Sequence, residues 1–241
     1  MGDKRRIVVY DRNPGKVHLL RKESRVEMAG DLASALRQAE MLVIAVRPAS
    51  VAGILDEVAK CGVAPPKLCV SLAAGVPLRN LRKSLRVRWV RAMPSPVCRI
   101  GRGLTALYFD RGVSDVECKR VRALFVRVGA VVEIPERQFD AFTAAYSSSH
   151  GYHALAALAK AAQRAGLDRA VALTAAAHAL SDGVFYWRES GQELPALLHE
   201  AATPGGIAAA TMAAMDKSGY ARVVENGLRA GIVQARRNAK R

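Results

Sequence analysis

Aromatic side chains and long hydrophobic runs are both scarce in this sequence of 241 residues. Phe, Trp and Tyr make up 5% of the chain, although 51% of its residues are hydrophobic. A core built from such residues must be aliphatic and rich in alanine, which favours closely packed helices over a β-sandwich. The apolar runs are interrupted well before the roughly 18 residues that a membrane-spanning helix requires, so we expect no membrane span.

Cysteine pairs with metal-ligand spacing are absent as well. The four cysteines form no Cys-x-x-Cys pair and have no histidine at ligand spacing, which argues against zinc and for reduced, structural thiols. The opening Met-Gly-Asp-Lys-Arg-Arg leads directly into residues 7–10, too short an apolar run for a signal peptide. We therefore expect a cytoplasmic protein.

Acidic residues are outnumbered, with 21 Asp and Glu against 37 Lys and Arg, for a formal charge of +16. Such a balance suits a phosphate-rich partner. The basic residues are spread along the chain, with modest concentrations at 79–91 and 236–241, and no aromatic residues are interleaved to stack on bases. A basic bias of the whole proteome would look the same, so we do not expect a nucleic-acid partner.

Residues 1–135 alternate short aliphatic runs with charged helical stretches, which is typical of a parallel sheet covered by helices. The pattern predicts strands at 7–10, 41–46, 68–72, 87–92, 104–109 and 130–134. It predicts helices at 14–22, 32–38, 50–60, 78–84 and 115–128. Because open α/β sheets bind ligands at the carboxyl ends of their strands, candidate site residues follow the strands.

The first of these strand ends carries Asp11, Arg12 and Asn13. In a dinucleotide-binding sheet an acid here bonds the ribose hydroxyls, and a following arginine can meet a 2′-phosphate, so the cofactor can be NADH or NADPH. The alternative is an Asx turn that caps a helix at Pro14. The Gly-rich turn expected about 20 residues earlier is missing. Gly101-Arg-Gly-Leu-Thr-Ala106 matches its pattern but leads into a predicted strand instead of opening a helix.

Residues 136–241 are dense in alanine and predict an all-α domain of helices packed largely on one another. Thr203-Pro-Gly-Gly206 interrupts the run. Thr203 as N-cap and Pro204 in the first turn would open a helix through Met212, with free backbone N–H groups that glycine lets an anion approach. We take this as a candidate carboxylate site; the alternative is an ordinary capped helix start.

Four motifs in this order carry a resemblance: Ala45-Val46-Arg47-Pro48, Val70-Ser-Leu-Ala-Ala-Gly-Val76, Arg91-Ala-Met-Pro94 and Thr203-Pro-Gly-Gly206. Together they resemble the pyrroline-5-carboxylate reductase family over essentially the whole chain. The resemblance implies a Rossmann-like domain at 1–135 and a helical dimerisation domain at 136–241 that interlocks with a twofold mate, often within larger rings of dimers. It also implies NADPH or NADH as cofactor and hydride transfer to the imine carbon of pyrroline-5-carboxylate, giving proline.

The resemblance assigns cofactor roles to the predicted strand ends. It places the adenosine ribose at Asp11, Arg12 and Asn13. The segment that lies against the cofactor's ribose is Ala45, Val46, Arg47 and Pro48. The residues near the nicotinamide are Ala73, Ala74, Gly75, Met93, Pro94 and Ser95. Lys4 matches the family's second strand, so the first strand, glycine-rich turn and first helix have no counterpart. The missing strand would lie mid-sheet and leave two neighbours unpaired. We expect either a true start upstream or an impaired nucleotide site.

The resemblance assigns the substrate to Thr203, Gly206, Ile207 and Ala208. The family usually has threonine where Ala208 stands, with its hydroxyl near the imine nitrogen. Other departures are Leu32, Ser95-Pro96 and the stretch 147–151; His150 or His153 could donate a proton instead. The aromatic cluster 185–187 suggests core or dimer packing. Two alternatives remain: a relative with changed substrate or lost activity, and a basic helical dimer that acts as a binding scaffold.

Overall fold

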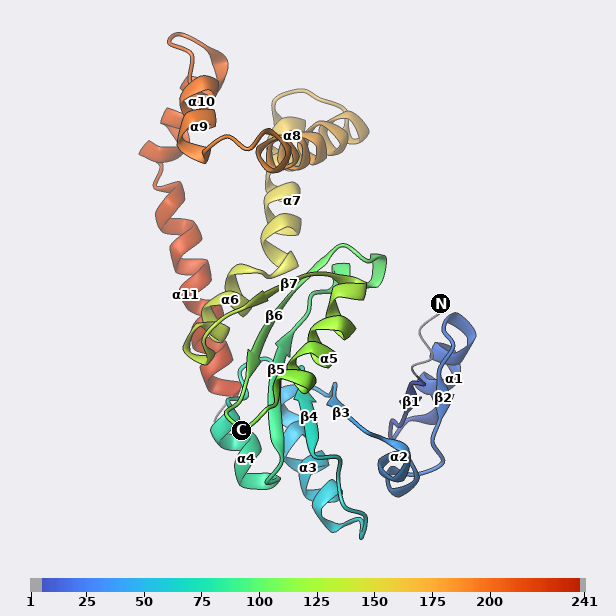
Figure 1. The fold of residues 1–241 in the computed structure, drawn as a ribbon. Helices are drawn as coiled ribbons and strands as arrows, with labels where there is room; N and C mark the ends of the chain where they lie inside the picture. The colour runs from blue at the N-terminus through green and yellow to red at the C-terminus, as the bar shows by residue number, and fades with distance from the viewer. Residues whose placement is uncertain (1–5, 239–241) are drawn as a thin grey trace. The chain divides into compact units, whose positions relative to one another are not determined.

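The structure is a computed structural model that describes residues 6–238. The chain divides into two compact units, which we treat separately (Figure 1). The sheet unit comprises the chain through Thr143 together with the segment from Ile232 onward, and the helical unit comprises Ala144–Gly231. The domain boundary between residues 135 and 136 stays a prediction, since this division reflects contacts alone.

A five-stranded sheet forms the centre of the sheet unit, in the order β3 (Leu42–Ile44), β4 (Leu68–Ser71), β5 (Arg88–Met93), β6 (Gly103–Phe109) and β7 (Gly129–Glu133). Strands β3, β4 and β5 are parallel, as predicted, whereas β6 runs antiparallel to β5 and β7 parallel to β6. The prediction of an all-parallel sheet is therefore wrong at one pair. Only residues 94–102, which include the short helix η2 (Pro96–Ile100), join β5 to β6, too few for a parallel crossover.

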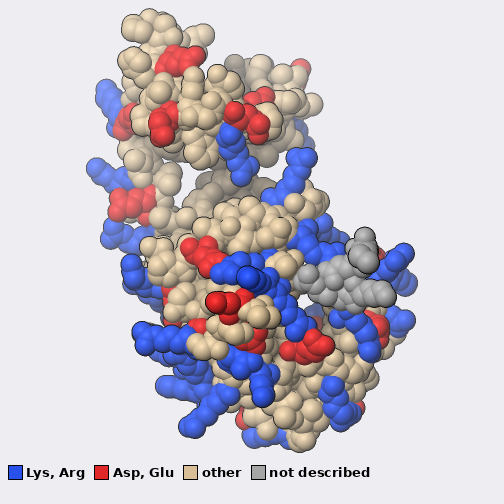
Figure 2. Space-filling model, viewed as in Figure 1, with Lys and Arg blue, Asp and Glu red and all other residues tan. Residues whose placement is uncertain are grey.

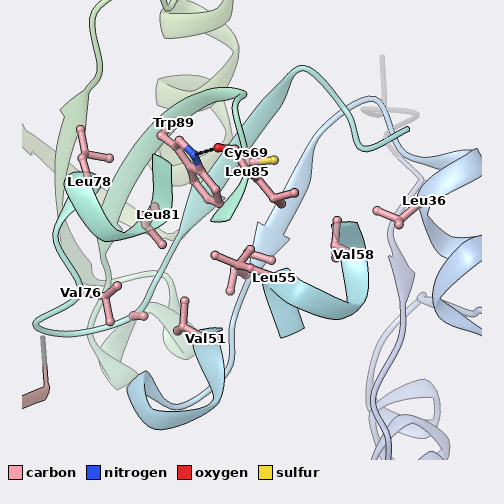
Figure 3. Packing of buried hydrophobic residues seen from close by; sticks show 12 residues of the cluster. Leu36, Val51, Leu55, Val58, Cys69, Val76, Leu78, Leu81, Leu85 and Trp89 are labelled. Atoms are coloured by element: carbon pink, nitrogen blue, oxygen red, sulfur yellow. Dashed lines mark hydrogen bonds between the residues drawn. The ribbon is translucent and has the colours of Figure 1, made fainter. Parts of the chain in front are cut away.

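Helices cover both faces of this sheet. Buried residues of α3 (Val51–Lys60) and α4 (Leu78–Ser84) pack with Trp89 on one face, and those of α5 (Asp115–Phe125) pack on the other. Figure 3 shows the first of these clusters, in which Trp89 Nε1 donates a hydrogen bond to the Leu85 carbonyl at 3.1 Å. The aliphatic core with few aromatic side chains matches the expectation from composition.

The N-terminal part of the sheet unit forms a separate parallel pair, β1 (Val8–Val9) and β2 (Glu27–Met28), with helices α1 (Pro14–Glu23) and α2 (Leu32–Gln38). Strand β2 was not predicted from the sequence. It has only two residues, both exposed, so no alternation of apolar and polar residues marks it. Within the described residues β1 pairs only with β2, and β3 only with β4. This agrees with the expectation of two strands that each lack one neighbour.

Helix boundaries in this unit follow capping signals in the sequence. Asp31 and Ser34 form a capping box that starts α2, and Ser114 and Glu117 form another that starts α5. Three short 3₁₀ helices complete the unit: η1 (Pro48–Ser50), η3 (Val126–Val128) and η4 (Glu136–Gln138).

The C-terminal region is helical, as predicted: α6 (Phe139–Ala145), α7 (Ser148–Arg164), α8 (Arg169–Ser190), α9 (Leu194–Ala201), α10 (Ile207–Lys217) and α11 (Tyr220–Asn238). Helices α7 and α8 pack on each other. The described buried hydrophobic residues of the helical unit are all alanine: Ala159, Ala172 and Ala176. The helices exist, but a single chain gives them little core of their own. No described helix combines the length and the hydropathy needed to cross a bilayer.

Candidate active site

Three of the four predicted strand ends meet at one edge of the five-stranded sheet. In the parallel register Ile44 lies opposite Ser71, and Ser71 lies opposite Arg91. The segments that follow, residues 45–48, 73–75 and 93–95, therefore leave the sheet side by side. This edge is where an open α/β sheet binds its ligand.

The central segment, residues 73–75, is referred to below as the Ala-Ala-Gly loop. Its first amide, Ala73 N–H, donates to Ser71 Oγ at 3.3 Å. Gly75 has φ +73°, and a Cβ atom there would lie 2.2 Å from the carbonyl oxygen of Ala235 in α11. The position thus requires glycine for both its backbone angle and its close packing. The contact with α11 joins residues 160 apart, and no local signal could have predicted it.

The fourth strand end, residues 11–13, follows β1 in the two-stranded sheet and is exposed. Asp11 Oδ1 accepts from Asn13 N–H at 2.8 Å, and Asn13 Oδ1 accepts from Gly15 N–H at 3.0 Å and caps α1. The structure therefore has the predicted Asx turn, but Asn13 rather than Asp11 caps the helix. Arg12 is paired with Glu57 of α3. Asp11 uses one carboxylate oxygen in this turn, which is compatible with a ribose contact through the other.

The Thr203-Pro-Gly-Gly206 segment, called here the Pro-Gly-Gly turn, is a turn in front of α10. Gly206 N–H donates to the Thr203 carbonyl at 2.8 Å, and Gly205 has φ +77°, as a type II turn requires after proline. Helix α10 starts at Ile207 with Gly206 as N-cap, so the prediction that Thr203 caps this helix is wrong. Because Gly205, the third residue of the turn, has this positive φ, the chain reverses direction before the helix begins.

The start of α10 offers backbone donors without a side-chain cap. Gly206 supplies no capping group, and Ile207 is 89% exposed. The first amides of a helix have no intrahelical acceptor, so they point outward as anion donors. Ala208 is exposed and carries only a methyl group. A Cβ atom on Gly206 would lie 2.9 Å from the Thr203 carbonyl oxygen, which leaves no room for a larger residue.

The remaining sequence candidates make contacts of their own or are exposed. His150 Nε2 bonds to the Ala144 carbonyl at 2.9 Å, which uses its ring proton structurally. His178 in α8 pairs with Asp182 one helical turn away, at 3.0 Å. Gly103 begins strand β6, which confirms that the glycine pattern at 101–106 is no phosphate cradle. The aromatic cluster 185–187 is 44–65% exposed, so within one chain it does not form core.

Sequence reasoning missed an ion pair next to the Ala-Ala-Gly loop, between a buried arginine and a half-buried glutamate. The Arg91 side chain in β5 is 4% exposed, and its Nη1 lies 3.4 Å from Glu136 Oε1 at the start of η4. The same carboxylate oxygen accepts from Leu78 N–H, the first amide of α4, at 2.6 Å. The Arg91 guanidinium also lies 4.5 Å from the centre of the Phe139 ring. Burial lowers the pKa of Arg91 from its ordinary value, and Glu136 opposes that shift.

Comparisons with known proteins agree with this arrangement. Residues 136–238 match the family model described as pyrroline-5-carboxylate reductase dimerisation, and residues 1–75 match the one described as NADP oxidoreductase, coenzyme F420-dependent. Pyrroline-5-carboxylate reductase of Synechocystis sp. is 30% identical over 98% of this chain and 88% of its own length. The Thermus thermophilus enzyme is 37% identical over 71% of this chain and 65% of its own.

Solved structures show the same fold. The Streptococcus pyogenes pyrroline-5-carboxylate reductase superposes with a TM-score of 0.86 at 23% identity, over 97% of this chain and 90% of that one. The Plasmodium falciparum enzyme, solved with NADP bound, gives 0.81 at 21% identity over 90% and 83%. Together with the full-length sequence relationship, these findings show that the chain belongs to the pyrroline-5-carboxylate reductase family.

Proposed function

We propose that this chain reduces pyrroline-5-carboxylate to proline with NADPH or NADH as the reductant. The observation that carries the proposal is the Pro-Gly-Gly turn, which leaves the first amides of α10 uncapped in a member of this family. A carboxylate placed there would accept from main-chain N–H groups and interact favourably with the helix dipole. Gly205 and Gly206 have no side chain that would block that approach.

The residues at the strand ends fit the two ends of a nicotinamide dinucleotide. Ala45, Ala73 and Ala74 carry small side chains, which let a flat ring approach the main chain where β3 and β4 end. Asp11, Arg12 and Asn13 are exposed and suit the adenosine ribose. We assign no described residue to the pyrophosphate. When bound, the nicotinamide supplies the hydride.

The protein's own part in the reaction is placement rather than acid–base chemistry. The imine carbon accepts a hydride and its nitrogen takes a proton, and a cyclic imine is readily protonated in water. The turn would hold the carboxylate and the Ala-Ala-Gly loop would set the nicotinamide face. Correct placement of two reactants alone can supply about 7–11 kcal/mol of barrier reduction.

Residues 136–238 carry the match to the dimerisation model, and we assign the working form to a homodimer, from which larger rings of dimers can assemble. Many large apolar side chains of α7–α11 are exposed in the single chain, among them Phe185 at 65% and Val223 at 66%. A second copy of the chain would remove this apolar surface from water. A cytoplasmic location stays a prediction from the sequence.

Assay of the purified protein with pyrroline-5-carboxylate and each nicotinamide cofactor tests the proposal, with proline as the measured product. Gly206→Val should abolish turnover, because its side chain would press on the Thr203 carbonyl and cover the amides. Gly206→Ala should lose less. Thermal midpoint and molecular mass, measured for both variants, distinguish a blocked site from an unfolded chain. Full turnover by a folded Gly206→Val would exclude the turn as the carboxylate site.

Ala208 favours a second candidate, a family member with a changed substrate or lost activity. Its methyl group cannot supply the hydroxyl that the family resemblance implies near the imine nitrogen. Nicotinamide binding without turnover of pyrroline-5-carboxylate would support this reading, and a panel of other cyclic imino acids would then locate the substrate. Binding of nucleic acid without any nicotinamide binding would instead support a basic scaffold.

A further inference from the structure

The cluster of Arg91, Glu136, Leu78 and Phe139, called here the Glu136 junction, has no assigned role in the proposed reaction. It joins three elements: strand β5 through Arg91, helix α4 through the Leu78 amide, and the start of η4 through Glu136. Leu78 and Glu136 alone are 58 residues apart, so only the folded sheet unit creates this cluster.

Glu136 takes the place of a missing helix cap. Pro77 is the N-cap residue of α4 and provides no side-chain hydrogen bond. The Glu136 carboxylate accepts from the first helical amide instead, and a negative charge at this end also suits the helix dipole. Because Leu78 follows Gly75 by three residues, this bond fixes the point at which the Ala-Ala-Gly loop enters its helix.

Arg91 contacts the same Glu136 oxygen as the Leu78 amide, and it lies in register beside the end of the strand that leads into the loop. Its register partner in β4 is Ser71, whose hydroxyl oxygen accepts from Ala73 N–H. The junction therefore reaches the elements on both sides of the loop: Arg91 pairs with the end of β4 before it, and Glu136 bonds to the start of α4 after it. Gly75 in between packs on Ala235 and cannot move outward freely.

Stability alone does not account for Arg91. Its Nη2 is buried and has no hydrogen-bond partner among the described residues. A buried polar group left unsatisfied is costly, and an apolar side chain of similar size often stabilises such a site more. What the guanidinium adds is a fixed position for the Glu136 carboxylate.

We infer that Glu136, held in place by Arg91, is a positioning residue that fixes the Ala-Ala-Gly loop in the geometry needed against the nicotinamide. The inference rests on the proposed function, because that function is what places the nicotinamide at this loop. Glu136 is also the first residue of the segment that matches the dimerisation model. Loss of the junction should loosen the loop without unfolding the unit.

Amide hydrogen exchange of the full-length protein tests the positioning directly and needs no activity. In Glu136→Gln we expect exchange across residues 72–80 to accelerate at least about tenfold, since protection reports local opening. The matched control is Glu133→Gln. It removes the same charge as Glu136→Gln, but from an exposed glutamate of β7 that pairs with Arg122. It should leave that segment unchanged. Unaltered exchange at 72–80 in Glu136→Gln overturns the inference.

Kinetics with NADPH deuterated at the transferred hydrogen provide the second measurement. A misplaced nicotinamide slows hydride transfer, so Glu136→Gln should lower kcat at least about tenfold and raise the isotope effect. Partial unfolding would lower kcat and leave the isotope effect as it was. If Glu136→Gln does not fold, Arg91→Lys is measured in its place. This substitution keeps the positive charge and removes the planar guanidinium group. If both variants turn over at the rate of the unsubstituted protein with the same isotope effect, the positioning role of Glu136 is rejected. If the unsubstituted protein itself shows no turnover, the proposed function is rejected instead.

Discussion

Ala208 is the single residue that bears most on the proposed chemistry. It is the second residue of α10, exposed, and next to the uncapped amides that follow the Pro-Gly-Gly turn. The amides can hold a carboxylate without help from this side chain. A proton for the imine nitrogen, or a hydrogen bond that orients it, then has to come from elsewhere, because a methyl group offers neither.

Restoring the hydroxyl should therefore raise the rate. We expect Ala208→Thr to increase kcat/KM for pyrroline-5-carboxylate by about 10²-fold, the size of effect that one oriented donor has in other active sites. Ala210→Thr is the control, since it places the same residue on an exposed position of the same helix, pointing about 160° away by helix geometry. Equal rates in Ala208→Thr and the wild type would mean that no hydroxyl is needed at this point.

Residue-level prediction succeeded where a motif fixes local backbone geometry. The Pro-Gly-Gly turn could be picked out as a break because glycine after proline marks a special conformation, whereas Gly75 was named only through the family resemblance. Glu136 and Arg91 could not, because their contact joins residues 45 apart and depends on how η4 meets β5. The N-cap of α10 was misplaced by three residues, since threonine before proline reads equally well as a cap and as the first residue of a turn.

At the scale of elements, the predicted helices were closest to the structure where a cap or an end signal stands in the sequence. Helix α2, which begins at the Asp31 capping box, has the predicted bounds 32–38. Helix α4 also has its predicted bounds, 78–84, although Pro77 before it provides no side-chain cap. Strand direction is a different matter. Nothing in the apolar run of β6 says which way it pairs, and only the short link from β5 makes the antiparallel pair necessary. Strand β2 is too short and exposed to leave any periodic signal.

The capping box of α5 also predicts a pH dependence. Burial opposes ionisation of Glu117, but hydrogen bonds from the Ser114 amide and hydroxyl and from Arg88 outweigh it and lower its pKa below the ordinary 4.5. A carboxylate with a lowered folded-state pKa adds stability above about pH 4.5. That contribution is lost as the pH falls through the folded-state value.

Glu117→Gln should accordingly cost about 1 kcal/mol of unfolding free energy at pH 7 and progressively less below pH 4.5. Urea denaturation of both proteins at pH 7 and at pH 3.5–4 measures the difference. Glu225→Gln, which breaks an exposed pair with Arg229 on α11, serves as control and should change little at either pH. A difference that stays constant across this range would show that the charge of Glu117 is not what stabilises the cap.

At the scale of the whole molecule, the two units differ in what they bury. The sheet unit encloses clusters of large aliphatic residues around Trp89 and Val90, whereas the buried hydrophobic residues described in the helical unit are alanines. The two units also differ in surface charge. In the view of Figure 2, many Lys and Arg residues lie on the surface of the sheet unit, whereas residues without charge make up most of the surface of the helical unit. Alanine content predicted helices correctly but could not reveal that their apolar faces stay uncovered in a single chain.

One such face runs along α8. Leu173, Leu180, Val184 and Trp187 follow one another at spacings of seven, four and three, which places them on one side of the helix. They are 50%, 37%, 54% and 44% exposed. Burying one such side chain is worth about 1.5–3 kcal/mol, and in a homodimer each position occurs twice. Pairing through this stripe would therefore account for a helical unit that has no large residue buried within its own chain.

Val184→Asp should convert the protein to monomers, because it places a charge at the centre of the stripe on both subunits of the proposed dimer. Ala175→Asp, on the opposite side of α8 and also exposed, adds the same charge and should keep the dimer. Light scattering during gel filtration over a range of concentrations distinguishes one chain of 25.9 kDa from an assembly of twice that mass or more. Reductase activity should fall with the mass in Val184→Asp. A dimer that survives this substitution would mean that the chains pair through another face, and the exposed residues of α10 and α11 would be the next to carry the charge.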